Sequence, residues 1–205
     1  MVYQLSIEEG KFLVNLARQT VINSLQSGKA PHLPKNVSPK LMEQTGVFVT
    51  LNLIRNGAKM LRGCIGFPYP TTPLAQAVMN AAVSAATQDP RFPTVTPQEL
   101  SHISFEVSVL TPPELVTAEK PTDFPSKIKV GRDGLIIEKG YHKGLLLPQV
   151  PVEQNWNSKE FLTQTAIKAG LQPDAWLLKN TKIYLFQAII FEEEKPKGEI
   201  QLKKI

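Results

Sequence analysis

The stretch from Val47 to Gly66 reads VFVTLNLIRNGAKMLRGCIG, and it decides the fold that we expect. Apolar and polar side chains alternate from Val47 to Ile54, as is typical of a half-buried β-strand. The next residues include Asn56-Gly57, the sequence of a two-residue hairpin turn. The residues from Ala58 to Ile65 then form the returning strand. The stretch therefore predicts an antiparallel β-hairpin.

A two-residue turn also fixes which residues of the hairpin face each other. Counting outward from the turn, we expect the pairs Arg55–Ala58, Leu53–Met60, Leu51–Arg62 and Val49–Cys64. This register puts Arg62 and Cys64 on the most apolar side of the hairpin, although a β-bulge would change the faces. An unpaired buried guanidinium costs several kcal/mol, so Arg62 must either have a partner or open onto a cavity.

Helical patterns and further strands surround the hairpin. A capping box, Ser6 with Glu9, begins an amphipathic helix that Gly28 ends, and Thr72-Pro73 begins an alanine-rich helix. The other elements that we expect are a short helix opened by the capping box Thr96–Glu99, a strand over 102–110, a helix over 158–169 and a last long strand over 182–191. From Pro121 the pattern changes to short strands broken by glycine pairs.

This order of elements predicts an α+β fold: a mainly antiparallel β-sheet flanked by helices, in two unequal subdomains with a cleft between them. We expect the main lobe over about 1–115 plus 158–192 and the smaller lobe over about 116–157. The residues Trp156 and Trp176 are interpreted as anchors of the smaller lobe.

Composition limits the classes of function. The chain has 205 residues, a net charge of +5 and one cysteine, Cys64, which excludes an internal disulfide framework and favours a reducing cytoplasm. Three histidines without nearby carboxylates at ligand spacing argue against a metal site, and no phosphate-loop or dinucleotide motif predicts a cofactor. No apolar run is long enough to span a membrane. The dispersed basic residues favour a solvated surface over nucleic-acid binding.

The hexapeptide Leu61–Gly66 is the strongest candidate site. Arg62 is either a buried ion-pair partner of Glu106 or Asp89, or an anion clamp. Cys64 is a core cysteine, a thiol that contacts a ligand, or a nucleophile.

The glycines beside Cys64 also allow two interpretations. Gly63 and Gly66 either provide positive φ at a strand end or leave backbone N–H groups open to a ligand. Downstream, prolines on both sides hold Arg91 in the segment Asp89-Pro90-Arg91-Phe92-Pro93. Asp89 either caps that turn or belongs to the same site.

The chain resembles the AMMECR domain family, and Leu61–Gly66 is the most specific run. Supporting runs are Asp89–Pro93, Ser108–Thr111, Gly131 with Gly134, Leu147–Val150, and Glu153 with Trp156. The resemblance implies an α+β domain of two unequal subdomains with the hexapeptide near their cleft. The family has no established biochemical activity. Its members occur fused to, or encoded beside, Memo-type and radical S-adenosylmethionine proteins, which implies a shared pathway.

We therefore expect a cytoplasmic binding or regulatory domain that holds a small anionic ligand or peptide in the cleft near Leu61–Gly66. The binding residues that we predict are Arg62, Gly63, Cys64, Gly66, Asp89, Arg91 and Glu106. The alternative is an enzyme with Cys64 as nucleophile and Arg62 as the stabiliser of negative charge. A third hypothesis is weak nucleic-acid binding.

Overall fold

The structure, a computed structural model, describes residues 4–29, 31–69 and 71–204. Its helices are α1 (Ile7–Ser27), α2 (Leu74–Thr87), α3 (Phe124–Lys127), α4 (Gln149–Glu153) and α5 (Ser158–Lys168), with 3-10 turns at Pro39–Met42, Pro97–His102, Pro121–Asp123 and Ala175–Leu177. Its strands are β1 (Gly46–Arg55), β2 (Ala58–Phe67), β3 (Ile103–Leu110), β4 (Glu114–Leu115), β5 (Gly134–Lys139), β6 (His142–Leu146), β7 (Lys182–Phe186), β8 (Ala188–Glu193) and β9 (Ile200–Leu202). Antiparallel sheets with helices confirm the predicted α+β class.

The chain divides into two compact units. The first contains the described residues up to Leu110 together with Ile189–Lys204, and the second is Thr111–Ala188. We expected residues 158–192 to join the first unit, but α5 and β7 pack within the second. The cleft that the resemblance implies stays a prediction.

The long strand predicted over 182–191 is two strands, β7 and β8, which belong to different sheets. Gln187 interrupts it because its backbone bonds another segment of the chain. The Gln187 carbonyl accepts the Thr111 N–H at 2.9 Å, and the Gln187 N–H donates to the Thr111 hydroxyl at 2.8 Å.

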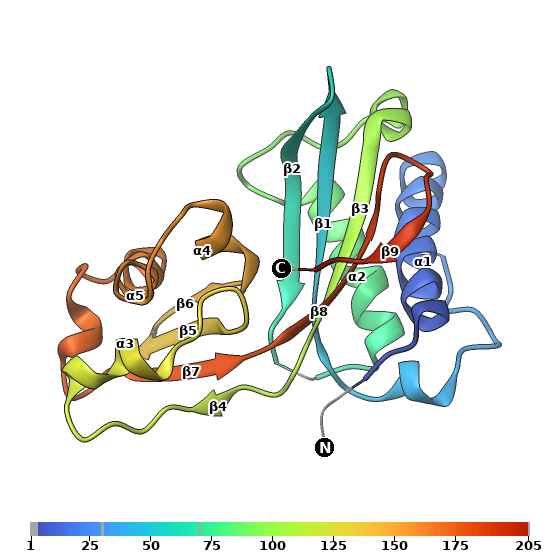
Figure 1. The fold of residues 1–205 in the computed structure, drawn as a ribbon. Helices are drawn as coiled ribbons and strands as arrows, with labels where there is room; N and C mark the ends of the chain where they lie inside the picture. Colours follow the sequence, from blue (N-terminus) through green and yellow to red (C-terminus); the bar gives the residue numbers. More distant parts are fainter. Residues whose placement is uncertain (1–3, 30, 70, 205) are drawn as a thin grey trace. The chain divides into compact units, whose positions relative to one another are not determined.

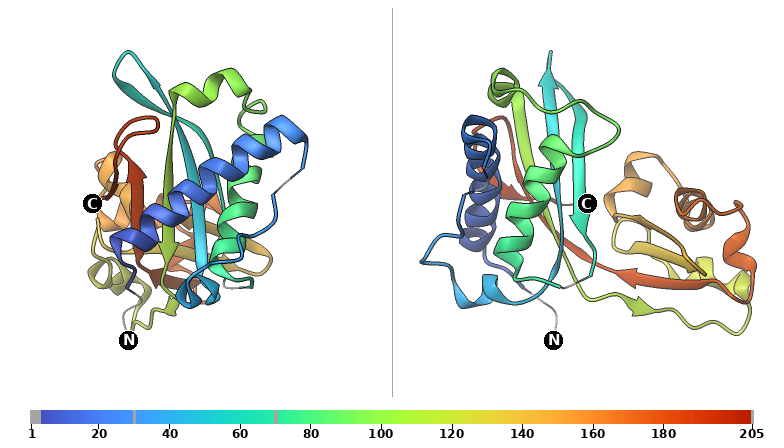
Figure 2. Two further views of the ribbon diagram at one scale, coloured as in Figure 1. Left: turned by 90° about the vertical axis from the view of Figure 1, so that its right-hand side faces the viewer. Right: turned by 180° about the vertical axis from the view of Figure 1, so that it is seen from behind.

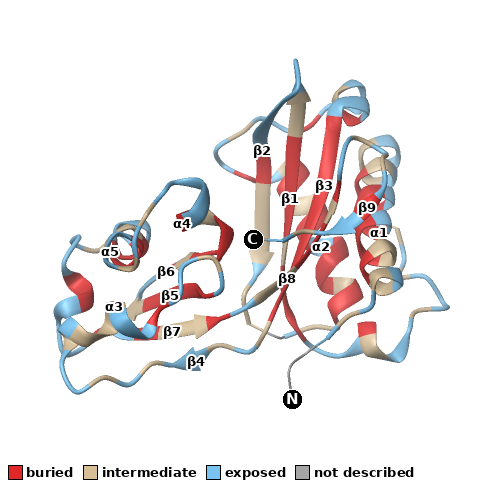
Figure 3. Ribbon diagram, in the orientation of Figure 1, coloured by how far each residue is buried: buried red, intermediate tan, exposed pale blue. Residues whose placement is uncertain are grey.

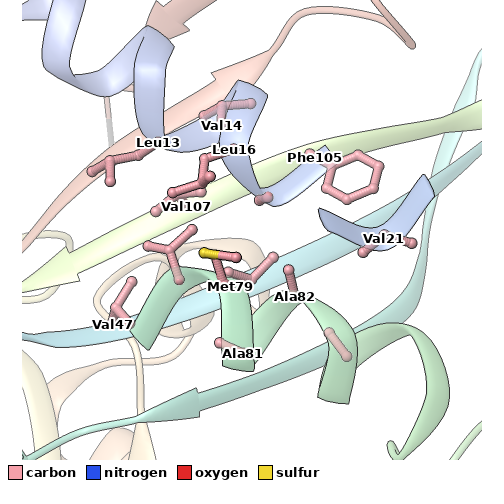
Figure 4. Packing of buried hydrophobic residues seen from close by; sticks show 14 of the residues in the cluster. Leu13, Val14, Leu16, Val21, Val47, Met79, Ala81, Ala82, Phe105 and Val107 are labelled. Carbon is pink, nitrogen blue, oxygen red and sulfur yellow. The ribbon is translucent and has the colours of Figure 1, made fainter. Parts of the chain in front are cut away.

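The first unit is a five-stranded sheet in the order β2-β1-β3-β8-β9, with α1 and α2 on one face (Figures 1 and 2). Apolar residues of β1 and β3 alternate toward these helices, and β3 is buried along its whole length (Figure 3). In Figure 4, Leu16 of α1, Met79 of α2 and Val107 of β3 gather between the helices and the sheet. This shared apolar core positions the strands that carry the candidate site.

Both helices of the first unit begin near the predicted residues. Ser6 and Glu9 form the predicted capping box, and Gly28 ends α1 in the left-handed conformation with φ 70°. Helix α2 begins at Leu74, so Pro73 is its N-cap and not its first helical residue. The alanines of α2 leave little side-chain bulk, and the helix backbone therefore comes close to the sheet.

The second unit is a four-stranded sheet in the order β4-β7-β5-β6. Its core joins Ile137 of β5 and Ile183 of β7 to Phe161 of α5. Trp176 is buried in this core and Trp156 packs against it, as the sequence predicted.

The central hairpin has the predicted turn and only part of the predicted register. Asn56 and Gly57 have φ of 52° and 76°, the left-handed values that a type I′ turn requires, and the pairs Arg55–Ala58 and Leu53–Met60 are confirmed. A bulge then shifts the ladder, because Asn52 pairs with Leu61 but Leu51 pairs with Gly63. The predicted pairs Leu51–Arg62 and Val49–Cys64 are therefore wrong.

Candidate functional site

The bulge moves Cys64 to the polar side of the hairpin. Cys64 lies opposite Thr50, and the Thr50 hydroxyl donates a hydrogen bond to the Cys64 sulfur at 3.2 Å. Val49, the predicted neighbour, faces the helices and is fully buried. Cys64 itself is only half-buried, so its thiol differs from a typical core cysteine.

Arg62 is the extra residue of the bulge, and protein acceptors occupy its guanidinium. Nε donates to Glu99 Oε1 at 2.8 Å, Nη2 donates to Glu99 Oε2 at 3.2 Å, and Nη1 donates to the carbonyl of Pro93 at 2.8 Å. The partner is thus Glu99, whereas the sequence suggested Glu106 or Asp89. Hydrogen bonds from Arg62 are the main reason why the pKa of Glu99 lies below its usual value, while burial opposes the shift.

Asp89 and Arg91 form a second ion pair beside Cys64. The buried Asp89 carboxylate accepts from Arg91 Nε at 2.9 Å and from Arg91 Nη2 at 2.7 Å. The hydrogen bonds from the Arg91 side chain lower the pKa of Asp89 to about 2, although burial acts in the opposite direction. The same pairing with Asp89 raises the pKa of Arg91, although burial acts in the opposite direction.

This second pair also covers part of the free edge of the sheet, where β2 is the outermost strand. The Cys64 amide donates to Asp89 Oδ2 at 2.8 Å, and Arg91 Nη2 donates to the Cys64 carbonyl at 3.2 Å. The Asp89–Arg91 pair therefore makes, at Cys64, the two hydrogen bonds that another strand would make. Segment 89–99 is held along this edge by its hydrogen bonds to Cys64 and Arg62.

The two glycines of the hexapeptide are explained by close packing. A Cβ on Gly63 would lie 2.1 Å from the carbonyl oxygen of Ala85 in α2, and one on Gly66 would lie 2.3 Å from Phe48. Neither glycine has a positive φ, so that interpretation is wrong. Their role is to let a helix and an aromatic ring approach the strand.

Glu106 lies on the same side of the sheet as Cys64, two strands away on β3. It pairs with Thr50 across β1 and β3, and its carboxylate accepts from Lys203 Nζ at 3.0 Å. The structure therefore brings Cys64, Asp89 and Arg91 together. Arg62 and Glu106 belong to two other ion pairs, with Glu99 and Lys203 respectively.

Sequence reasoning missed Thr50 and Glu99. Thr50 is a polar residue within an apolar strand, which is a weak signal for a special role. Glu99 fits its capping box so well that no second partner was expected, and it does bond the Thr96 amide at 2.8 Å. Among the residues that the structure describes, no His, Cys, Asp and Glu side chains gather as a metal site.

The depressed pKa of Asp89 gives a prediction for acid stability. Its value of about 2 lies below the usual 3.8, so the ionised carboxylate stabilises the fold at pH values above about 4. This contribution, about 2 kcal/mol, should disappear as the pH falls through 2. Urea unfolding of the wild type and of Asp89→Asn at pH 7, 4, 3 and 2 measures it. Because asparagine does not titrate, the variant should not show this part of the loss of unfolding free energy that the wild type shows at low pH. Equal pH slopes of the unfolding free energy for both proteins would contradict the assignment.

These features define an α+β protein with a polar site at the edge of an antiparallel sheet. The AMMECR1 family model matches residues 14–191, most of the chain, and the chain therefore belongs to the AMMECR1 family. Within the described residues no helix has the length and apolarity needed to cross a bilayer.

Relatives match over all or nearly all of their length. Protein PH0010 of Pyrococcus horikoshii is 53% identical over 206 residues, which cover 100% of both chains. Protein MJ0810 of Methanocaldococcus jannaschii is 50% identical over 201 residues, which cover 98% of both. The crystal structure of the uncharacterized protein PH0010 matches with a TM-score of 0.93 and 54% identity, over 97% of this chain and 98% of that one. These names state no activity.

Proposed function

We propose that the chain is a binding domain that holds a small anionic ligand, or an acidic group of a peptide, at Arg91 beside Cys64. The observation that carries the proposal is the state of the Arg91 side chain. It is 49% exposed, yet the buried Asp89 carboxylate fixes two of its nitrogens. An arginine held in one position loses less conformational entropy when it binds an anion.

The free part of this guanidinium is its Nη1 group. Among the residues described, no protein acceptor is hydrogen-bonded to Arg91 Nη1, whereas the Arg62 nitrogens all bond protein oxygens. We therefore assign the ligand contact to Arg91. We assign to Arg62 the role of holding segment 89–99, which carries Arg91, in place.

We still expect the protein to function in a reducing cytoplasm.

An anion titration tests this assignment, and the chain supplies a matched control. Arg132 pairs with Asp133 in the same bidentate geometry, and the Arg132 side chain is 47% exposed. Thermal melts of wild type, Arg91→Met and Arg132→Met are compared with phosphate, succinate and a nucleoside triphosphate. An anion at about five times its Kd should raise the Tm of wild type and Arg132→Met by about 2–4 °C. The Arg91→Met variant should not respond.

Two outcomes of these melts would contradict the proposal. One is a wild type that is indifferent to every anion at constant ionic strength. The other is an Arg91→Met variant that responds as strongly as Arg132→Met.

A second candidate function is nucleophilic chemistry at Cys64. It is favoured by the Thr50 hydroxyl, which donates to the Cys64 sulfur, and by the Arg91 guanidinium, which donates to the Cys64 backbone carbonyl. A hydrogen-bond donor and a nearby cation both favour the thiolate form of a cysteine. His102 bonds Ser101 and His142 bonds the Ala169 carbonyl, so these histidines are engaged elsewhere. In this arrangement neither His102 nor His142 supplies a base at Cys64.

Alkylation measures the reactivity of this thiol directly. Iodoacetamide should label Cys64 in the folded protein faster than a free cysteine at pH 7, and Arg91→Met should slow labelling several-fold. The Arg132→Met variant should label at the wild-type rate. If labelling requires denaturation, Cys64 is not a nucleophile.

A further inference from the structure

The face of the five-stranded sheet opposite α1 and α2 is polar and almost completely buried. Alternation along β1 and β3 puts on this face Thr50, Asn52, Ser104, Glu106 and Ser108, each at most 8% exposed. Buried polar groups destabilise a fold unless hydrogen bonds satisfy them. A sheet face that only needed covering would carry apolar residues.

Charged side chains meet at Glu106 on this face. Glu106 is 3% exposed, and its carboxylate lies 3.0 Å from Lys203 Nζ and 3.8 Å from Lys59 Nζ. Glu192 lies 2.6 Å from the Lys59 ammonium and 3.9 Å from that of Lys203. The carboxylate of Glu106 is thus already a binding site for a primary ammonium group.

The lysine closest to Glu106 comes from the end of the chain. Lys203 follows β9, and its backbone N–H donates to the Ile190 carbonyl at 2.8 Å. Its ammonium reaches the buried carboxylate from the tail, where the Lys203 residue is only partly buried.

Ser108 adds a second polar group on the same face of the sheet. It is two residues from Glu106 on the same strand, so both side chains point to the same face. The Ser108 hydroxyl is fully buried and has no hydrogen-bond partner among the described residues. An unsatisfied hydroxyl two residues from an ammonium site, on the same face of one strand, points to a ligand that carries both kinds of group.

We propose that Glu106 and Ser108 form a binding site for a small amine with a neighbouring hydroxyl group. The ligand's ammonium takes the place of Lys203 on Glu106, and its hydroxyl bonds the Ser108 side chain. This site is independent of the anion contact at Arg91, because it recognises a cation through different residues. Lys203 is its competitor within the chain.

The test removes the competitor and adds simple amines. Thermal melts compare Lys203→Met with Lys204→Met, the exposed neighbouring lysine, in ethanolamine, ethylamine or sodium chloride at equal ionic strength and pH. Ethanolamine should raise the Tm of Lys203→Met by about 2–4 °C more than that of Lys204→Met. Ethylamine should have a smaller effect, and adding Ser108→Ala should abolish the difference between the two amines. Equal responses of both lysine variants, or equal effects of both amines, would overturn the proposal.

If Lys203→Met does not fold, a measurement on the wild-type chain tests the same proposal. When ethanolamine displaces the Lys203 ammonium from Glu106, trypsin should cleave the tail after Lys203 several-fold faster. The Glu106→Gln variant should show no such dependence on ethanolamine. A cleavage rate in the wild type that ethanolamine leaves unchanged would overturn the proposal.

Discussion

We expect the Arg62→Met variant to lose about 3 kcal/mol of unfolding free energy. The substitution removes the ion pair with Glu99 and leaves the carbonyl of Pro93 without its donor. The loss should lie near the lower end for buried pairs, because the Glu99 side chain is 28% exposed and keeps its bond to Thr96. Urea unfolding at pH 7 measures the difference.

The Arg55→Met variant is the matched control for this result. Arg55 is an exposed arginine at the end of β1, so its replacement should change stability by less than about 0.5 kcal/mol. If Arg62→Met also loses less than about 1 kcal/mol, Arg62 is not needed to fasten segment 89–99, and a direct role in ligand binding becomes the better explanation.

The Gly63→Ala variant should lose at least about 3 kcal/mol, which lowers the Tm by about 6–12 °C or prevents folding. The added Cβ would lie 2.1 Å from the Ala85 carbonyl oxygen. That atom belongs to the backbone of α2, so no side-chain rotation relieves the contact. Either the helix or strand β2 must move, and the move would displace Cys64.

The Gly28→Ala variant distinguishes the stability cost of a steric clash from the cost of an unfavourable backbone conformation. Gly28 has φ +70°, and a Cβ added there would meet no atom within 4 Å, so this variant should lose only about 1 kcal/mol. Similar losses for both variants would show that the contact with α2 is relieved at little cost. Circular dichroism melts are sufficient to compare them.

Local patterns predicted much of the fold correctly. Capping residues marked the ends of α1, and Asn56-Gly57 identified the hairpin because both residues must adopt positive φ. The boundary between β7 and β8 could not be predicted. It depends on Gln187 bonding Thr111, a residue 76 positions away, and no local pattern encodes such a contact.

The site was predicted less well than the fold because a single bulge changed it. The alternation that assigned Cys64 to the apolar face is correct up to Leu61, and one extra residue, Arg62, then reverses it. Asp89 and Arg91 were singled out as candidates from the rigidity of their loop. Their hydrogen bonds to the backbone of Cys64 depend on tertiary structure, which periodicity does not describe.

The topology also constrains the order in which the chain can fold during synthesis. The second unit is one continuous segment, whereas the first is completed only by Ile189–Lys204. Until β8 leaves the ribosome, the nascent sheet ends at β3, and Arg18 lacks its carboxylate partner Glu193. The second unit can therefore fold while the first still exposes a strand edge, so a pause in translation before Ile189 would prolong a state that is open to aggregation.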